Sequence, residues 1–100
     1  MAKQYFVYIL TNKSKSTLYI GVTNDLTKRS IEHKFKEETT FPKRYNINRL
    51  VYYKETNDIE TAIKREERLK KWNREWKERL INDFNPEWKD LAEHLNKSLI

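Results

Sequence analysis

Two strand-sized apolar runs stand close together near the start of the chain, and they constrain its fold more than any other feature. The first is Tyr5–Leu10 and the second is Leu18–Val22, with a polar segment over residues 12–16 between them. Short runs of β-branched and aromatic residues joined in this way predict a β-hairpin. We therefore expect the fold to be organised around a small antiparallel sheet.

Tyr8 and Tyr19 are predicted to lie on one face of this hairpin, opposite the aliphatic side chains. If the two tyrosines pair directly, a four-residue loop joins the strands. A five-residue loop would instead place Tyr8 opposite Ile20. Cross-strand packing is the ordinary explanation of two such tyrosines, and a shared chemical role is the alternative.

Gly21 is the only glycine in 100 residues, and it stands near the end of the second run. A plain strand-to-helix turn would explain it. A chain that uses glycine once can also need it for an unusual φ or for the close approach of another group. We expect one of these two reasons.

The middle of the chain predicts one helix and one further strand. Thr23 or Asn24 is suited to cap a helix that extends to about Lys36. A polar loop is expected over residues 37–48. A third strand is expected over residues 50–53.

The remainder of the chain predicts helices. Residues 57–60 resemble a capping box that begins a long helix, which bends near Asn73 and continues to Asp83. Asn85-Pro86-Glu87 predicts the start of a last helix. The apolar stripe expected on that helix consists of Trp88, Leu91, Ala92 and Leu95.

These elements predict an α+β fold, in which a small three-stranded antiparallel sheet is flanked by helices in the order β-β-α-β-α-α-α. One hundred residues correspond to a single domain, residues 1–100.

No cysteine is present, which excludes disulfides and thiolate chemistry, and two histidines are too few for a zinc centre built by the protein. No apolar run reaches the length of a membrane span. We expect a cytoplasmic monomer that does not contact membranes.

The charge distribution favours a polyanionic partner. Twenty-one lysines and arginines against fifteen acids leave a net charge of +6, and residues 64–79 carry +4 of it. The ordinary explanation is a solvated helix with ion pairs such as Glu67–Lys71 and Glu75–Arg79.

Glu66 is out of place in the predicted long helix. A carboxylate within an apolar stripe costs stability unless it is paired or binds a cation. A salt bridge to Arg29 or to a lysine is the structural explanation. The stripe consists of Ile59, Ala62, Ile63, Glu66, Leu69 and Lys70.

Together, several of these positions resemble the GIY-YIG nuclease superfamily, and most closely its small stand-alone bacterial domain proteins. Phe6-Val7-Tyr8 corresponds to the first signature element, with Phe6 in place of glycine, and Tyr19-Ile20-Gly21 to the second. Arg29 follows ten residues after the second tyrosine, and His33 follows one helical turn later. The resemblance covers residues 4–92 and includes the helix that contains Glu66.

The resemblance implies an endonuclease that hydrolyses phosphodiester bonds in DNA. Tyr8 or Tyr19 would act as the general base or orient the water, Arg29 would bind the phosphate, and His33 would relay a proton. Glu66 would be the sole protein ligand of a single Mg²⁺ or Mn²⁺ ion. Residues expected to hold the nucleic-acid backbone are Lys34, Lys70, Lys71 and Arg74. The asparagine of the family corresponds to Asn82 or Asn85.

Two other classes of function fit the same sequence. One is a nucleic-acid-binding module without catalysis. The other is an accessory protein that recruits a partner through the surface formed by Trp72, Trp76 and Trp88.

Overall fold

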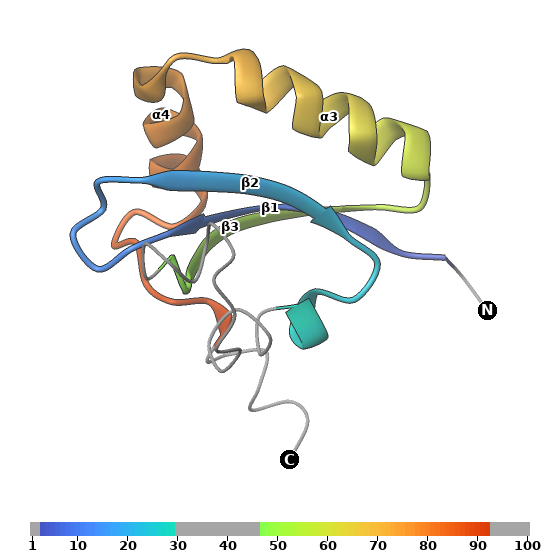
Figure 1. Cartoon of the computed structure of the whole chain (residues 1–100), viewed down its shortest axis with the longest axis horizontal. Coiled ribbons are helices and arrows are strands. Elements are labelled where there is room, and N and C mark those ends of the chain that lie inside the picture. The colour runs from blue at the N-terminus through green and yellow to red at the C-terminus, as the bar shows by residue number, and fades with distance from the viewer. Residues whose placement is uncertain (1–2, 30–46, 93–100) are drawn as a thin grey trace.

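The computed structural model describes residues 3–29 and 47–92, and it has one antiparallel sheet with helices. The strand order is β2-β1-β3, and both long helices lie on the same side of the sheet (Figure 1). This confirms the predicted α+β class and the predicted element order as far as α4. The elements are β1 (Tyr5–Thr11), β2 (Leu18–Thr23), β3 (Arg49–Thr56), α3 (Ile59–Lys71) and α4 (Arg74–Phe84).

The hairpin register differs from both predicted registers. Tyr8 is paired with Gly21, and Tyr19 is paired with Leu10. The loop therefore has six residues, because the last pair of the ladder is Thr11 with Leu18. The side chain of Asn12 organises this longer loop by accepting hydrogen bonds from backbone N–H groups of residues 16 and 17, at 2.9 and 3.3 Å.

Thr23 and Asp25 organise the start of the helix that follows β2. The Asp25 carboxylate accepts from the backbone N–H of Lys28 at 3.0 Å, and Thr23 Oγ1 accepts from the backbone N–H of Asp25 at 3.1 Å. Asp25, rather than Thr23 or Asn24, is therefore the residue that caps this helix. The structure describes its first turn, residues 26–29. Its predicted end near Lys36 lies outside the described residues.

A bulge in β3 moves two adjacent side chains to the same face. Ile9 pairs with Tyr52, whereas the next residue of β1 pairs with Leu50, so Val51 is the extra residue. Val51 and Tyr52 consequently both pack on the helix side of the sheet. Leu50 and Tyr53 pack on the opposite side.

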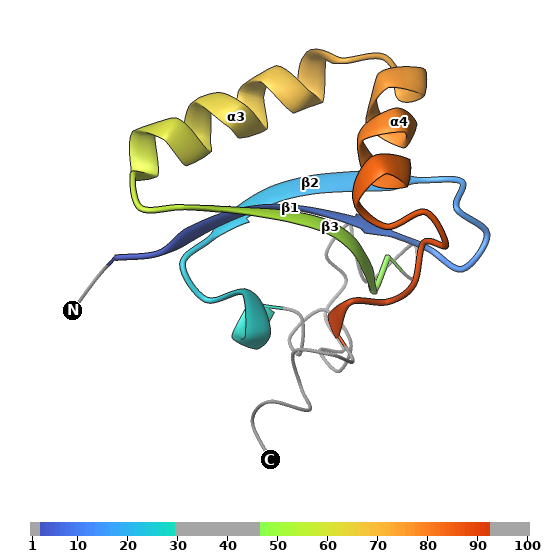
Figure 2. The same ribbon diagram turned by 180° about the vertical axis from the view of Figure 1, so that it is seen from behind.

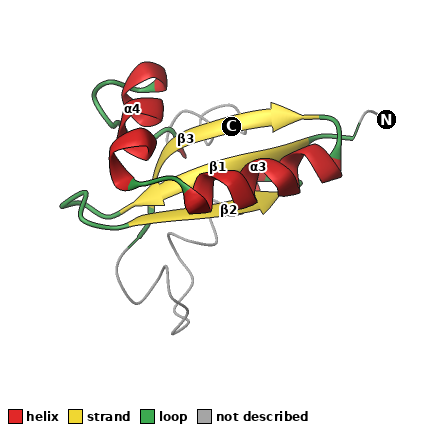
Figure 3. Cartoon of the chain, turned by 90° about the horizontal axis from the view of Figure 1, so that it is seen from above, coloured by secondary structure: helices red, strands yellow, loops and turns green. Residues whose placement is uncertain are grey.

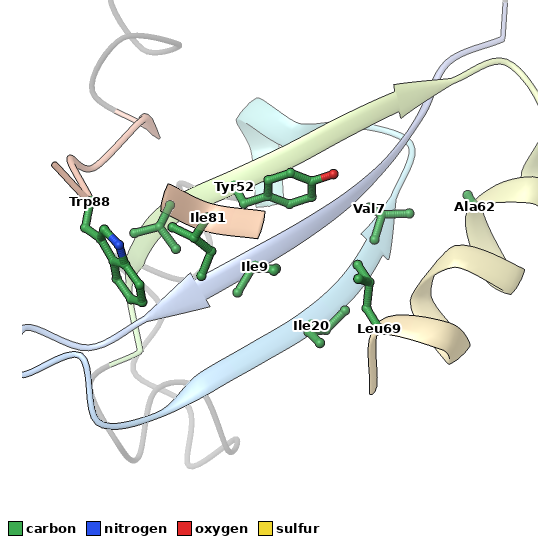
Figure 4. Close-up of a cluster of buried hydrophobic side chains, with 9 residues drawn as sticks. Val7, Ile9, Ile20, Tyr52, Ala62, Leu69, Ile81 and Trp88 are labelled. Carbon is green, nitrogen blue, oxygen red and sulfur yellow. The ribbon is translucent and has the colours of Figure 1, made fainter. Parts of the chain in front are cut away.

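The helix side of the sheet forms an aliphatic core. Val7, Ile9 and Ile20 of the hairpin pack against Leu69 of α3 and Ile81 of α4 (Figure 4). Burial of such side chains contributes about 1.5–3 kcal/mol each. As Figure 3 shows, α3 runs along the strands and α4 crosses near one end of the sheet. In the described part of the chain, neither helix is long and apolar enough to cross a membrane.

The caps of the two helices explain the predicted bend. The Asp58 side chain accepts from the backbone N–H of Glu60 and caps α3, and the Asn73 side chain accepts from the backbone N–H of Trp76 and caps α4.

The apolar stripe of α3 is narrower than predicted, because Ile59 and Ile63 are 40% and 44% exposed.

The segment after α4 is not the helix that Pro86 predicts. Trp88 has φ of 54°, in the left-handed region, and the chain first becomes helical at Ala92. Figure 2 shows this segment passing from the helix side to the opposite side of the sheet. Trp88 therefore packs on the helix side, whereas Leu91 and Ala92 pack on the other. These three residues do not form the single stripe that the sequence predicts, and Leu95 lies outside the described residues.

Candidate functional site at the β2 edge

Tyr8 lies directly across the backbone of Gly21. A Cβ atom added to Gly21 would be 2.5 Å from Tyr8 Oη and 2.6 Å from its Cζ, closer than real Cβ atoms approach. The φ of Gly21 is not positive, so close approach, and not unusual backbone geometry, explains the only glycine. The Tyr8 ring thus extends from the central strand across β2, which is an edge strand.

Tyr19 and the helical turn that contains Arg29 lie on the same face as Tyr8. Tyr8 is 3% exposed, whereas Tyr19 is half-buried in the same cluster. Leu26 anchors the turn to this cluster. Arg29, three residues later, is exposed and lies at the point where the described helix ends. The prediction that the tyrosines oppose the aliphatic core is confirmed.

Glu66 approaches β2 from the other face of the sheet. Ala62 and Leu69 define the buried side of α3. Arg65 lies on one flank of this side, where it lines a cavity with residues 54–56 of β3. Because successive helical residues are about 100° apart, Glu66 lies on the opposite flank, toward β2. The structure therefore brings the two tyrosines and Arg29 to one face, and places Glu66 across the sheet edge from them.

Glu66 is neither a core residue nor half of a buried ion pair. Its side chain is 22% exposed and accepts a hydrogen bond from Lys70 at 3.3 Å. This is the predicted pairing with a lysine, and not with Arg29. The Lys70 side chain is 55% exposed, so water reaches this pair. A helical pair at this spacing contributes only about 0.3–0.5 kcal/mol, so Glu66 can exchange Lys70 for another cation at low cost.

The chemistry of this one carboxylate fits a hydrated Mg²⁺ ion. Mg²⁺ keeps several waters and is bound by one or two carboxylates. Across residues 3–29 and 47–92, no group of three or more His, Cys, Asp or Glu side chains could hold a metal.

Among the residues predicted to bind the nucleic-acid backbone, Lys70 and Lys71 differ from Arg74. Both lysines are exposed. Arg74 instead donates to the backbone carbonyls of Lys15 and Ser16, the latter at 2.9 Å. Its guanidinium thus ties the start of α4 to the hairpin loop, a structural contact that the spacing of charges in the sequence does not reveal.

Some of the predicted ion pairs on this surface form and some do not. Glu75 pairs with Arg79 at 3.2 Å, as predicted. Glu67 does not pair with Lys71; the neighbouring Glu66 has a lysine partner in its place. The solvated-helix explanation therefore holds for part of the basic segment.

Asn82 and Asn85 both make hydrogen bonds with the segment after α4. Asn82 Oδ1 accepts from Trp88 Nε1 at 2.5 Å. Asn85 is 6% exposed, donates to the carbonyls of Val51 and Lys89 at 3.2 and 2.8 Å, and accepts from the backbone N–H of Lys89 at 3.1 Å. These contacts give each asparagine a structural role.

Three further predictions concern residues outside this arrangement. His33 and Lys34 lie outside the described residues. Trp88 is 6% exposed and belongs to the core, so the predicted partner surface of three tryptophans is wrong in that respect. Only Trp72 and Trp76 remain on the surface of α3 and α4.

Comparison with known proteins agrees with this geometry. A family model described as the GIY-YIG catalytic domain matches residues 4–79, which include Tyr8, Gly21, Arg29 and Glu66. The chain therefore belongs to the GIY-YIG catalytic domain family, a nuclease superfamily.

Two relatives resemble the chain over most of its length. A UPF0213 protein of Natronomonas pharaonis is 31% identical over 83 residues, which cover 83% of this chain and 96% of that protein. The solution structure of a UPF0213 protein from Bacillus halodurans matches with a TM-score of 0.56 and 25% identity, covering 87% of this chain and 92% of that one. Both matches extend over almost the whole of the related protein, so this chain resembles a stand-alone domain.

Proposed function

We propose that the chain is a metal-dependent DNA endonuclease that hydrolyses phosphodiester bonds, directed by the backbone or shape of its substrate. The observation that carries the proposal is the Tyr8 ring lying across Gly21. The sheet edge that results has phenol groups on one face and the Glu66 carboxylate on the other flank. A phosphodiester at this edge would have access to both.

Each residue has a distinct part in the proposed reaction. Tyr8 or Tyr19 holds the attacking water by its hydroxyl and, as general base, removes its proton. Arg29 donates two parallel hydrogen bonds to non-bridging oxygens of the phosphate, which its planar guanidinium suits. His33 passes a proton. Glu66 would hold a single Mg²⁺ or Mn²⁺ ion, which when bound stabilises the charge on the leaving oxygen.

The exposed basic side chains of α3 supply the expected backbone contacts. Lys70 and Lys71 project from the last turn of that helix, and Lys34 is proposed to act with them. Such contacts position the nucleic acid without reading its bases. If four or five phosphates are neutralised, the slope of log K against log salt concentration is about −4.

Cleavage tests this proposal directly. Labelled duplex, branched and single-stranded DNA are incubated with the protein in Mg²⁺, in Mn²⁺ and in EDTA. Products with either metal and none in EDTA are expected. Salt-dependent binding without cleavage in any condition would contradict catalysis and identify a binding module. Absence of binding to every substrate would contradict the nucleic-acid partner itself.

A further inference from the structure

The helices α3 and α4 meet at a corner (Figure 1). An exposed aromatic groove that the proposed chemistry does not use lies there. Trp72, which ends α3, and Trp76, in the first turn of α4, line a cavity of about 240 Å³. The other lining residues are Arg79, Leu80 and Asp83. We propose that this groove binds an unpaired nucleobase of the nucleic acid on which the domain acts. The inference rests on the proposed function, because it assumes a nucleic-acid partner.

The two tryptophans are held in a defined arrangement. Their ring centroids are 5.7 Å apart with an interplanar angle of 86°, an edge-to-face contact. The Arg65 guanidinium lies 5.8 Å from the centre of the Trp72 ring, and Trp72 packs against the aliphatic core. Trp72 is therefore fixed from two sides. Trp76 is 52% exposed and presents its ring to solvent, where a base could stack.

The other groups that line the groove suit a base. Arg79 offers N–H donors, and Asp83 offers carboxylate acceptors. Hydrogen-bond acceptors and hydrogen-bond donors on the edge of a nucleobase can therefore both find a partner. Asp83 also disfavours a bare phosphate at the same place, because like charges repel. Base stacking does not depend strongly on sequence, since every base has a π-face.

The charge of the surrounding surface identifies the partner as a polyanion. Residues 64–79, which include both tryptophans and Arg79, carry a net charge of +4. Lys71 precedes Trp72 and Lys77 follows Trp76 in the sequence, and among the described residues no carboxylate forms an ion pair with either lysine. A strand bound at this corner would therefore meet the basic side chains of this segment. Aromatic rings among basic residues are the combination by which proteins bind single-stranded nucleic acid.

The test compares two labelled strands that differ only in their bases. Binding of decathymidine and of a strand of ten abasic sugar-phosphates is measured by fluorescence anisotropy, in EDTA so that nothing is cleaved. The intact protein is expected to bind decathymidine roughly 5- to 150-fold more tightly than the abasic strand. Trp76→Ala should reduce this ratio to about one, and Trp76→Phe should keep part of it.

Ile63→Ala is the matched control, because Ile63 is a 44% exposed apolar residue of α3 outside the groove. It should leave the ratio unchanged. Equal, salt-dependent binding of the two strands by the intact protein would overturn the groove proposal while leaving the proposed backbone binding intact. It would instead favour a protein partner for the groove. A ratio that Trp76→Ala does not alter would also overturn the groove proposal. Failure of the intact protein to bind either strand would overturn both the groove proposal and the proposed nucleic-acid binding.

Discussion

The two edges of the sheet are built in different ways. At the β3 edge, the segment after α4 binds the strand: the Leu50 backbone N–H donates to Asp90 Oδ1 at 3.1 Å, and the Leu50 carbonyl accepts from the Leu91 N–H at 2.8 Å. Asn85 adds a buried hydrogen bond to Val51. The chain therefore uses its own residues to satisfy backbone groups of Leu50 and Val51 at one end of this edge, where unpaired groups otherwise favour unwanted strand pairing.

The β2 edge instead carries residues that we propose for the chemistry. Tyr8 reaches across the strand and Gly21 leaves space for it, and helical geometry places Glu66 on the flank of α3 toward the same edge. Polar groups at the β3 edge are paired with one another, whereas Glu66 has an exposed lysine as its partner. The difference agrees with the proposal that one edge maintains the fold and that the other carries the chemistry.

Gly21→Ala is expected to have the largest effect on stability. The new methyl group must displace a rigid, buried ring, and overpacking of this kind costs about 3 kcal/mol. Urea unfolding measures the change in free energy. In a Tyr8→Ala background the same substitution should cost much less, because the two sites are in contact. Equal costs in the two backgrounds would show that Gly21 does not serve Tyr8.

Asn85→Ala should weaken the opposite edge by about 2 kcal/mol, because it leaves the buried carbonyl of Val51 and the partly buried backbone of Lys89 without this partner. Asn82→Ala is the control, since Asn82 is exposed and makes one hydrogen bond, to Trp88. Its cost should be smaller. If Asn85→Ala were to leave the free energy of unfolding unchanged but abolish DNA cleavage, the division of roles between the edges would be wrong.

Arg74→Met should cost about 1 kcal/mol, because the hairpin loop loses two hydrogen bonds from the guanidinium. Hydrogen exchange should become faster in residues 12–17. Lys77→Met removes the same charge from the same helix without touching the loop, and it should leave that exchange unchanged. Similar acceleration in both variants would mean that charge, and not these hydrogen bonds, holds the loop.

Thr61→Val should have the smallest effect, confined to the start of α3. The Thr61 hydroxyl donates to the Asp58 carboxylate at 2.7 Å and holds the pKa of Asp58 below its usual range. Because the folded state lowers this pKa, the stabilisation is present near neutral pH and is lost as the pH falls through the folded value. NMR titration of the Asp58 carboxyl carbon should show a higher pKa in Thr61→Val. The shift in Lys64→Gln should be smaller, since Lys64 has a weaker influence.

The sequence predicted the elements well where local signals agree. Alternating side chains located the hairpin strands and separated the tyrosines from the aliphatic core. Asp58 lies within the predicted helix start, and Asn73 lies at the predicted bend, where it caps α4. Both positions were recognisable because short polar side chains hydrogen-bond to nearby backbone groups and so favour helix starts. The likeness to the GIY-YIG family was also recognisable, since its residues recur at fixed spacings.

Features set by contacts between distant parts of the chain were not predictable in this way. The hairpin register depends on the hydrogen bonds of Asn12 within the loop, and no turn motif marks it. Asn85-Pro86-Glu87 has the local pattern of a helix start. Tertiary contacts override it, since Trp88 enters the core and Leu91 binds β3. Glu66 also lay on the predicted stripe, but Ile59 and Ile63 face solvent, so the stripe itself was too wide.

The most direct test of the account is cleavage of labelled DNA in Mg²⁺ by Glu66→Ala, with the unfolding free energy of the same protein determined in EDTA. Removing a partly exposed i,i+4 pair and substituting alanine in a helix should change the free energy of unfolding by less than about 0.5 kcal/mol. We predict that the wild-type protein cleaves, and that the variant folds equally well, still binds DNA and does not cleave. Cleavage by Glu66→Ala at the wild-type rate, or destabilisation by several kcal/mol, would contradict the claim that the β2 edge is the catalytic one.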